Sequence, residues 1–374
     1  ITKNIFIKIL PNSYKLCSIC IAFSLYFTLK YGIIESVRKK ENTITMQNTH
    51  DLQKLEYYKI IEQLSTYCCT VFGKEQCQAL MPSFEKETVQ TWLNETSEGE
   101  SLISRKGNFP LYPITDIRLW IKSLESHSAL SAKALLDIAY ILSLSRELKT
   151  YFYAEEEPSI SVMYPILDTY FSRLYANPKI ENQIKNSILD EYTMADNASS
   201  KLSSLRQNRR KLENDLKEDL NKILHSSTYS KMIMESIITI RNERYVIPIK
   251  EEYRGSIKGF IHDVSSSGST LYIEPLSIFD MNNKINSIKV EEAKEIERIL
   301  EELSTLLFPY VEELKENLYL IGHIDFIFAK VQLAKSLDGV LPALNDKKEI
   351  HLIKARHPFI DKNQVVPIDL SIGQ

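Results

Sequence analysis

"ADNASSKLSSLRQNRRKLENDL", residues 195 to 216, decides the fold, because apolar residues recur in it at alternating spacings of three and four. The recurring positions are Ala195, Ala198, Leu202, Leu205, Arg209, Leu212 and Leu216. Arg209 is the one charged residue in this series. A heptad pattern of this kind predicts a helix that buries one seam against a partner helix.

A second helical run, residues 278 to 307, supplies the partner seam. Its repeat positions are Ile285, Ile288, Glu292, Ile296, Ile299, Leu303 and Leu306. Two long seams separated by a connecting segment favour an antiparallel coiled-coil pair. The connecting segment then lies at the tip of that pair.

The connecting segment, residues 231 to 275, has a different composition from the helical runs on either side. "SIITI", "YVIPIK", "IKGFIHDV" and "TLYIEP" are rich in β-branched and aromatic residues, which favour strands. Between them, "RNER", "EEYRGS" and "SSGS" are typical of turns, and Gly255, Gly259 and Gly268 fall here. We therefore expect a mainly α protein with a long antiparallel coiled coil and a small antiparallel β sheet at its tip.

The chain has 374 residues, which is more than one compact core usually holds. Residues 52 to 177 are amphipathic and helical in pattern, and predict a helical core. The net charge is −3, so a nucleic-acid role must rest on a local basic patch. The five cysteines include one C-x-x-C, Cys17 to Cys20, without a second pair at metal spacing. A redox or zinc role is an alternative there, but a reducing, cytoplasmic compartment and no metal site are expected.

Residues 1 to 45 precede the amphipathic pattern. Leu16 to Leu29 is uncharged, but it is shorter than the roughly 20 residues that span a bilayer. No cleavage site of a signal peptide follows it. The expectation is that Met46 is the native start, that residues 1 to 45 are upstream translation or disordered, and that no membrane is involved. A membrane anchor is the alternative.

"GFIHDVSSSGSTLYIEP", residues 259 to 275, places His262 and Asp263 beside several serines. In a regular strand two adjacent side chains point to opposite faces, so this pair would not form a hydrolase dyad. Val264 stands where the first glycine of G-x-S-x-G is required, and no phosphate-binding G-x-x-x-x-G-K-[ST] occurs. The serine run is therefore interpreted as a tight hairpin turn, and no catalytic residue is expected.

Basic residues also gather in this segment. They are Arg241, Arg244, Lys250, Arg254, Lys258 and His262. On a rigid sheet such side chains can contact phosphates without reading bases, which makes them candidate nucleic-acid-binding residues. Glu243, Glu251 and Glu252 dilute the charge, and the alternative is that the basic side chains are merely solvated.

Four stretches, in their linear order, resemble the MutS family. "RNERYVIPIKEEYRGSIKGFIHDVSSSGSTLYIEPLSIFDMNNKI", residues 241 to 285, resembles its clamp and is most similar to the second bacterial MutS paralogue. "LEYYKIIEQLSTYC", from Leu55, is similar to the amino terminus of that branch, and "HIDFIFAKVQLA", from His323, to its lever helix. "IKARHPFIDKNQVVPIDLSIG", residues 353 to 373, resembles the strands that precede its ATPase P-loop.

The resemblance covers residues 46 to 374 and implies an organisation along the chain. It implies a helical core at 46–180, a lever helix at 181–230, a β clamp at 231–275, a returning lever helix and core at 276–345, and the start of an ATPase domain at 346–374. In this family the clamp would meet nucleic acid. The mismatch-reading and connector domains are absent from this branch.

The complete branch, as the resemblance implies, is a homodimeric ATPase that uses ATP and Mg²⁺, often with a nuclease domain. It restrains recombination or acts on stalled ribosomes, so branched or duplex DNA and ribosomal RNA are the implied partners. Val365, Val366 and Pro367 match the stretch that lines the adenine base. Because the sequence ends at Gln374, before a P-loop appears, we expect a truncated protein without its own ATPase or nuclease site or a bound cofactor. A coiled-coil adaptor that binds a protein partner is the alternative function.

Overall fold

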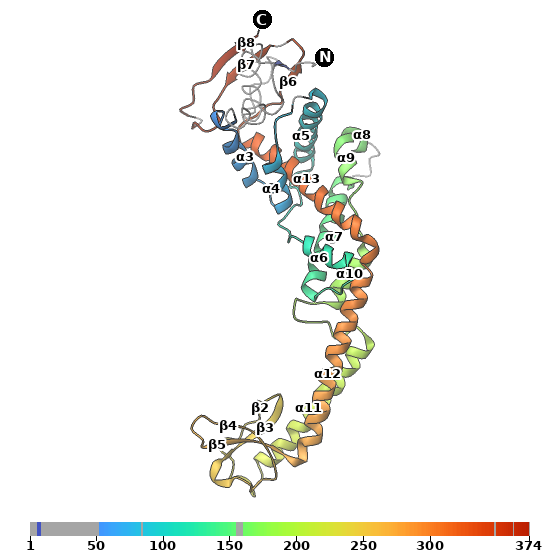
Figure 1. Cartoon of the computed structure of the whole chain (residues 1–374), viewed down its shortest axis with the longest axis vertical. Helices are drawn as coiled ribbons and strands as arrows, with labels where there is room; N and C mark the ends of the chain where they lie inside the picture. Colours follow the sequence, from blue (N-terminus) through green and yellow to red (C-terminus); the bar gives the residue numbers. More distant parts are fainter. Residues whose placement is uncertain are drawn as a thin grey trace, which may run out of the picture. The chain divides into compact units, whose positions relative to one another are not determined.

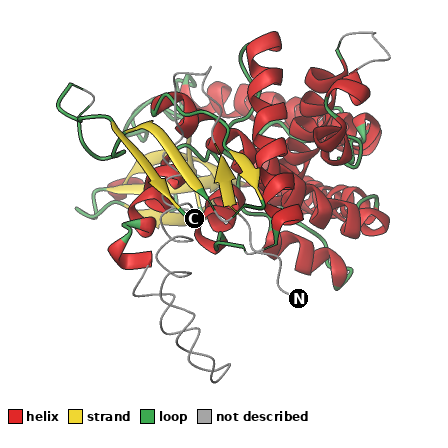
Figure 2. Ribbon diagram, turned by 90° about the horizontal axis from the view of Figure 1, so that it is seen from above, coloured by secondary structure: helices red, strands yellow, loops and turns green. Residues whose placement is uncertain are grey.

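The computed structural model describes residues 6–8, 52–83, 85–154, 160–347, 349–361 and 363–373. Within them the protein is predominantly helical with a small antiparallel sheet, which confirms the expected fold class (Figure 2). Apart from the backbone of residues 6–8, the predictions for residues 1 to 45, including the C-x-x-C, the leader and the start at Met46, lie outside the described residues. No helix in the described ranges combines the length and the apolar run that crossing a bilayer requires.

The chain divides into two compact units. The domain boundaries that the resemblance implies stay a prediction. The first unit comprises Ile1–Ile121, Asp137–Glu181 and Tyr310–Gln374, and the second comprises Lys122–Leu136 and Asn182–Pro309. Three of the four unit boundaries fall within α-helices, which are α6 (Arg118–Glu125), α7 (Ala132–Tyr153) and α10 (Pro178–Ser187), and the fourth falls in the 3₁₀ helix η3 (Phe308–Tyr310).

The first unit is built around α13. The other α-helices that lie wholly within it are α3 (Tyr57–Thr66), α4 (Val71–Ala79), α5 (Lys86–Lys106), α8 (Ile160–Met163) and α9 (Pro165–Phe171), and α13 spans Val311–Ser336. Most of α13 is buried because α3, α4, α5 and α9 all pack against it. Gly322 allows close packing here, since a Cβ at this position would lie 2.6 Å from the Phe72 Cβ.

The first unit also holds a four-stranded sheet in the order β6-β1-β7-β8. The strands span Ala343–Asn345 (β6), Phe6–Lys8 (β1), Ile350–Ala355 (β7) and Ile368–Ile372 (β8). β1 pairs antiparallel to β6 and parallel to β7, and β7 pairs antiparallel to β8.

The second unit contains the two helices that the seams predict. They are α11 (Ser200–Leu224) and α12 (Leu276–Thr305), which lie side by side (Figure 1). Ser199 at the start of α11 bonds Glu295 late in α12, and Arg209 bonds Glu292, so the pair runs antiparallel. Buried leucines and isoleucines line the seam, among them Leu202, Leu216, Ile285, Ile299 and Leu303.

A small antiparallel sheet lies at one end of this helix pair, in the order β2-β3-β5-β4 (Figure 1). Its strands are β2 (Thr239–Arg241), β3 (Arg244–Lys250), β4 (Gly259–Val264) and β5 (Thr270–Pro275). Asn242 and Glu243, both with positive φ, make the two-residue turn between β2 and β3. Gly268, also with positive φ, lies in the turn between β4 and β5, so the serine run is a hairpin turn as expected.

One face of this sheet packs against the helix pair through a hydrophobic cluster. The cluster joins Leu216, Leu220 and Leu224 of α11, Tyr245, Ile247, Ile249, Leu271 and Ile273 of the sheet, and Ile278 and Ile285 of α12. Because strands and helices share this core, the sheet is held firmly on the end of the two helices.

Candidate nucleic-acid interface

The six basic residues singled out in the sequence all lie in or beside the β2–β5 sheet, but they have different environments. Residues 231 to 275 hold as many acidic residues as lysines and arginines. The structure therefore decides which positive charges are neutralised within the sheet and which remain available to a ligand.

Glu274 of β5 is fully buried and is the centre of a polar network. Its carboxylate accepts a hydrogen bond from the Arg244 guanidinium at 2.9 Å, and the His262 Nε2 lies 2.6 Å from its other oxygen. The Asn282 side-chain amide of α12 donates to Glu274 at 2.7 Å, and the same amide bonds both the N–H and the C=O of Tyr245. Arg244 and His262 are thus internal groups that fix the sheet to α12.

Arg241 is also engaged within the sheet. Its Nε lies 3.1 Å from an Asp263 carboxylate oxygen, and its guanidinium lies 4.3 Å from the centre of the Tyr272 ring. The ion pair and the cation–π contact hold this side chain against β4 and β5. It keeps partial exposure, but its charge is balanced locally.

Lys250, Arg254 and Lys258 lie around the connection from β3 to β4. Lys250 is the last residue of β3, and Arg254 and Lys258 follow the short 3₁₀ helix Glu251–Tyr253 (η2). Arg254 is 58% exposed, and its one ion pair among the described residues is with Glu251, three residues earlier, at 3.2 Å. Such an exposed pair contributes little and yields readily to a phosphate. Within the described residues, neither Lys250 nor Lys258 has an ion-pair partner, and Lys258 is exposed.

A β-bulge changes the geometry around His262 and Asp263. The pairing of β4 with β5 shifts between Ile261 and Asp263, which leaves His262 as the extra residue. His262 bonds Glu274, while Asp263 pairs with the arginine that stacks on Tyr272. Tyr272 and Glu274 share one face of β5, so the expectation that His262 and Asp263 point to opposite faces is wrong.

The side-chain contacts around His262 and Asp263 also exclude a hydrolase site. Both His262 and Asp263 are bonded to other groups, and the hydroxyls of Ser265, Ser267 and Ser269 bond one another. Within the part of the chain that the structure describes, no hydrogen bond joins a serine of this turn to His262. Among the described residues, no group of three or more His, Cys, Asp and Glu side chains is arranged to hold a metal ion.

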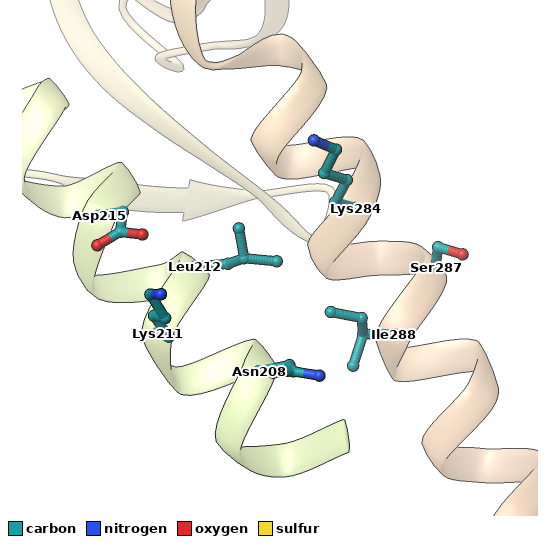
Figure 3. Close-up of a pocket in the computed structure, with 7 residues that line it drawn as sticks. All are labelled: Asn208, Lys211, Leu212, Asp215, Lys284, Ser287 and Ile288. Atoms are coloured by element: carbon teal, nitrogen blue, oxygen red, sulfur yellow. The ribbon is translucent and has the colours of Figure 1, made fainter. Parts of the chain in front are cut away.

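A shallow groove of about 470 Å³ lies between α11 and α12 (Figure 3). Leu212 and Ile288 point toward each other across it. The remaining lining residues are polar, namely Asn208, Lys211, Asp215, Lys284 and Ser287. This mixture of charges does not select one class of ligand.

The residues expected to line an adenine base lie in the first unit. Val365, Val366 and Pro367 precede β8, and Val366 and Pro367 are exposed. The backbone N–H of Val365 bonds the carbonyl of Asp361. Their nucleotide role stays a prediction.

The sequence patterns do not single out Phe260, Glu274 or Asn282. Glu274 and Asn282 complete the polar network, and Phe260 is a half-exposed aromatic residue on the edge strand. Two sequence features could have indicated the network. One is the charged Glu274 within the strand "TLYIEP", and the other is the pair Asn282–Asn283 near the start of an apolar helical run. Such residues mark a buried network only when the strand register is known.

Sequence comparisons connect this architecture to known proteins. The chain is 40% identical over 327 residues to Endonuclease MutS2 of Geobacillus sp. (strain WCH70), an alignment that covers 87% of this chain and 42% of that protein. The chain is also 40% identical over 327 residues to Endonuclease MutS2 of Acetivibrio thermocellus, and that alignment covers 87% of this chain and 41% of that protein. It is 37% identical over 320 residues to Endonuclease MutS2 of Listeria monocytogenes serovar 1/2a, and that alignment covers 86% of this chain and 40% of that protein. No model of a protein family matches the chain.

A mainly helical chain with these identities belongs to the MutS family. Within that family it is a MutS2 paralogue, which confirms the branch that the sequence resemblance indicates. The chain spans about two fifths of the length of the curated relatives it matches.

Proposed function

We propose that this chain is the core, lever and clamp portion of a MutS2-type protein, and that it contacts nucleic acid through the β2–β5 sheet. In this proposal α11 and α12 are the lever helices and the sheet is the clamp. The observation that carries it is the set of basic side chains left available on a rigid sheet, which are Lys250, Arg254 and Lys258.

Two properties of this patch favour contact with the phosphate backbone. Its side chains are exposed or partly exposed around one connection, while the sheet below them is fixed to two helices by a buried apolar cluster. A fixed array of cations binds phosphates by releasing condensed counterions, so affinity depends on salt and little on sequence. Nothing in the sheet resembles a recognition helix that enters a groove.

The relatives bear the name endonuclease, and the complete protein is proposed to be a homodimeric, ATP-dependent protein that restrains recombination or acts on stalled ribosomes. We assign neither ATP hydrolysis nor strand cleavage to residues of this chain. DNA and ribosomal RNA share the phosphate chemistry that the patch would bind, so both are tested as ligands.

The test measures binding of the chain to duplex DNA, branched DNA and ribosomes across a salt series. Each phosphate contact contributes about 0.9 to the slope of log affinity against log salt on duplex DNA, so Arg254→Ala with Lys258→Ala should reduce the slope by about 1.8. The matched control is Lys59→Ala with Lys222→Ala, which removes two exposed cations that also pair with an acidic residue three positions away.

The control variant should bind like the parent chain. If the Arg254 and Lys258 variant keeps the parent's affinity and slope, the proposed contact is wrong. Binding of a protein partner without any nucleic-acid affinity would instead favour an adaptor.

A further inference from the structure

Phe260 is an aromatic residue that the charge-based interface does not explain. It lies on β4, an edge strand of the sheet, and it is 49% exposed. Behind it stands Phe279 of α12, with ring centroids 5.0 Å apart and planes inclined by 38°. One side of the Phe260 ring is therefore supported by protein while much of the remainder faces solvent.

The support behind Phe260 is itself fixed. The Arg244 guanidinium lies 5.4 Å from the centre of the Phe279 ring, and it is anchored by Glu274 at 2.9 Å and by Asn283 at 2.6 Å. Because Phe260 packs against this fixed Phe279 ring, the Phe260 side chain loses little further conformational freedom when it binds a ligand. Its position is set before a ligand arrives.

An exposed cation, Lys258, lies two residues before Phe260 in the chain. The ladder between β4 and β5 continues to Lys258, whose carbonyl accepts a hydrogen bond from the N–H of Leu276 at 3.0 Å. Strand alternation then puts Lys258 and Phe260 on the same side of the strand. Gly259 lies between them, where a Cβ would be 2.2 Å from the Glu274 carbonyl oxygen, so this close strand approach requires glycine.

We propose that Phe260 is a stacking platform for an unpaired nucleobase, with Lys258 contacting the adjacent phosphate. This inference rests on the proposed nucleic-acid function and narrows its ligand to nucleic acid with single-stranded or unpaired bases. Every base has a flat π face, so stacking tolerates any sequence, whereas paired and stacked bases inside a duplex hide that face. Phosphate contacts alone would not distinguish single-stranded from duplex nucleic acid.

The experiment uses the full chain and fluorescence anisotropy with a labelled oligothymidylate, an oligouridylate of equal length and a duplex of equal length. Phe260→Leu should weaken binding to single strands about 5- to 150-fold, the range that one lost base stack produces, and should leave duplex binding unchanged. Phe260→Trp should retain single-strand binding, and its added indole emission should be quenched by the bound base. The two single strands distinguish DNA from RNA as the source of the base.

The control variant is Ile240→Ala on β2, which removes another exposed apolar side chain of the same sheet (52% exposed). If the parent chain binds none of these probes, the platform is wrong. The proposed function is wrong as well only if the parent chain also fails to bind branched DNA and ribosomes. If the parent binds them and Phe260→Leu binds single strands equally well, only the platform is overturned. Equal losses for Phe260→Leu and Ile240→Ala on all probes would indicate a general apolar contact and would also overturn stacking. Retained binding by Phe260→Trp guards against a loss caused by misfolding of the leucine variant.

Discussion

Arg209 of α11 and Glu292 of α12 face each other across the seam of the helix pair, with 2.7 Å between the Arg209 Nε and a Glu292 carboxylate oxygen. Each is a charged member of an otherwise apolar repeat. Their pairing satisfies both charges at one level of the antiparallel seam. A single ionic layer of this kind can fix register, because a shifted alignment would place each charge against apolar side chains.

Replacing Glu292 by leucine alone should destabilise the helix pair by about 1–3 kcal/mol, because Arg209 then lies in the seam with only Glu213 nearby. Replacing both residues by leucine should be neutral or stabilising, since apolar residues complete the heptad. Urea unfolding followed by circular dichroism measures both effects. A double variant less stable than the single variant would contradict this role, and Glu301→Leu, an exposed position on α12, is the control.

Glu274→Gln should loosen the β2–β5 sheet. The substitution keeps the shape of the side chain but removes the charge that balances Arg244, and it replaces one acceptor oxygen by a donor amide. Loss of a buried partner of this kind costs about 2–4 kcal/mol. Amide hydrogen exchange of Tyr245 and Ile273 should accelerate, whereas Glu243→Gln in the exposed turn should leave it unchanged. Unchanged protection in the Glu274 variant would show that the network does not anchor the sheet.

Glu95 should make the first unit sensitive to acid. It is 2% exposed, and burial alone would raise its pKa, but the hydrogen bond to His323, the charge of Lys330 and the hydrogen bond from Tyr170 together lower the pKa to about 2. A carboxyl whose pKa is lower in the folded chain stabilises it above its ordinary pKa near 4.5, and that contribution disappears as pH falls from 4.5 toward 2. Its full size is about 3 kcal/mol.

The measurement compares the free energy of unfolding of the parent and of Glu95→Gln at a series of pH values. The variant should be less stable at pH 7, and the difference should shrink as pH falls below 4.5. Glu62→Gln at an exposed position of α3 controls for the loss of one negative charge. A difference that is constant with pH would rule out the ionised carboxylate as its cause.

Gly259→Ala should destabilise the sheet more than Gly268→Ala. At Gly259 the new Cβ would meet the Glu274 carbonyl oxygen at 2.2 Å and the Ile273 Cγ2 at 2.8 Å, so β4 must move, at a cost of about 1–3 kcal/mol or more. At Gly268 the space is open, and only the positive φ of 73° opposes alanine, by about 1–2 kcal/mol. Thermal melting ranks the two variants. The reverse order would mean that β4 adjusts freely, and that the position of Phe260 is not fixed by Gly259.

Sequence patterns alone predict the helical runs, the two seams, the strands with their turns, and membership of the MutS family. These are local or alignable properties, since heptad spacing, β-branched runs and turn residues act over a few neighbouring positions. The tertiary structure alone decided what each charge does. Arg244 and Lys258 look alike in the sequence, yet one is bonded to a buried carboxylate thirty residues later and the other is exposed. That difference depends on cross-strand register, on the bulge at His262 and on the approach of α12 to the sheet, which bring together groups that no local pattern connects.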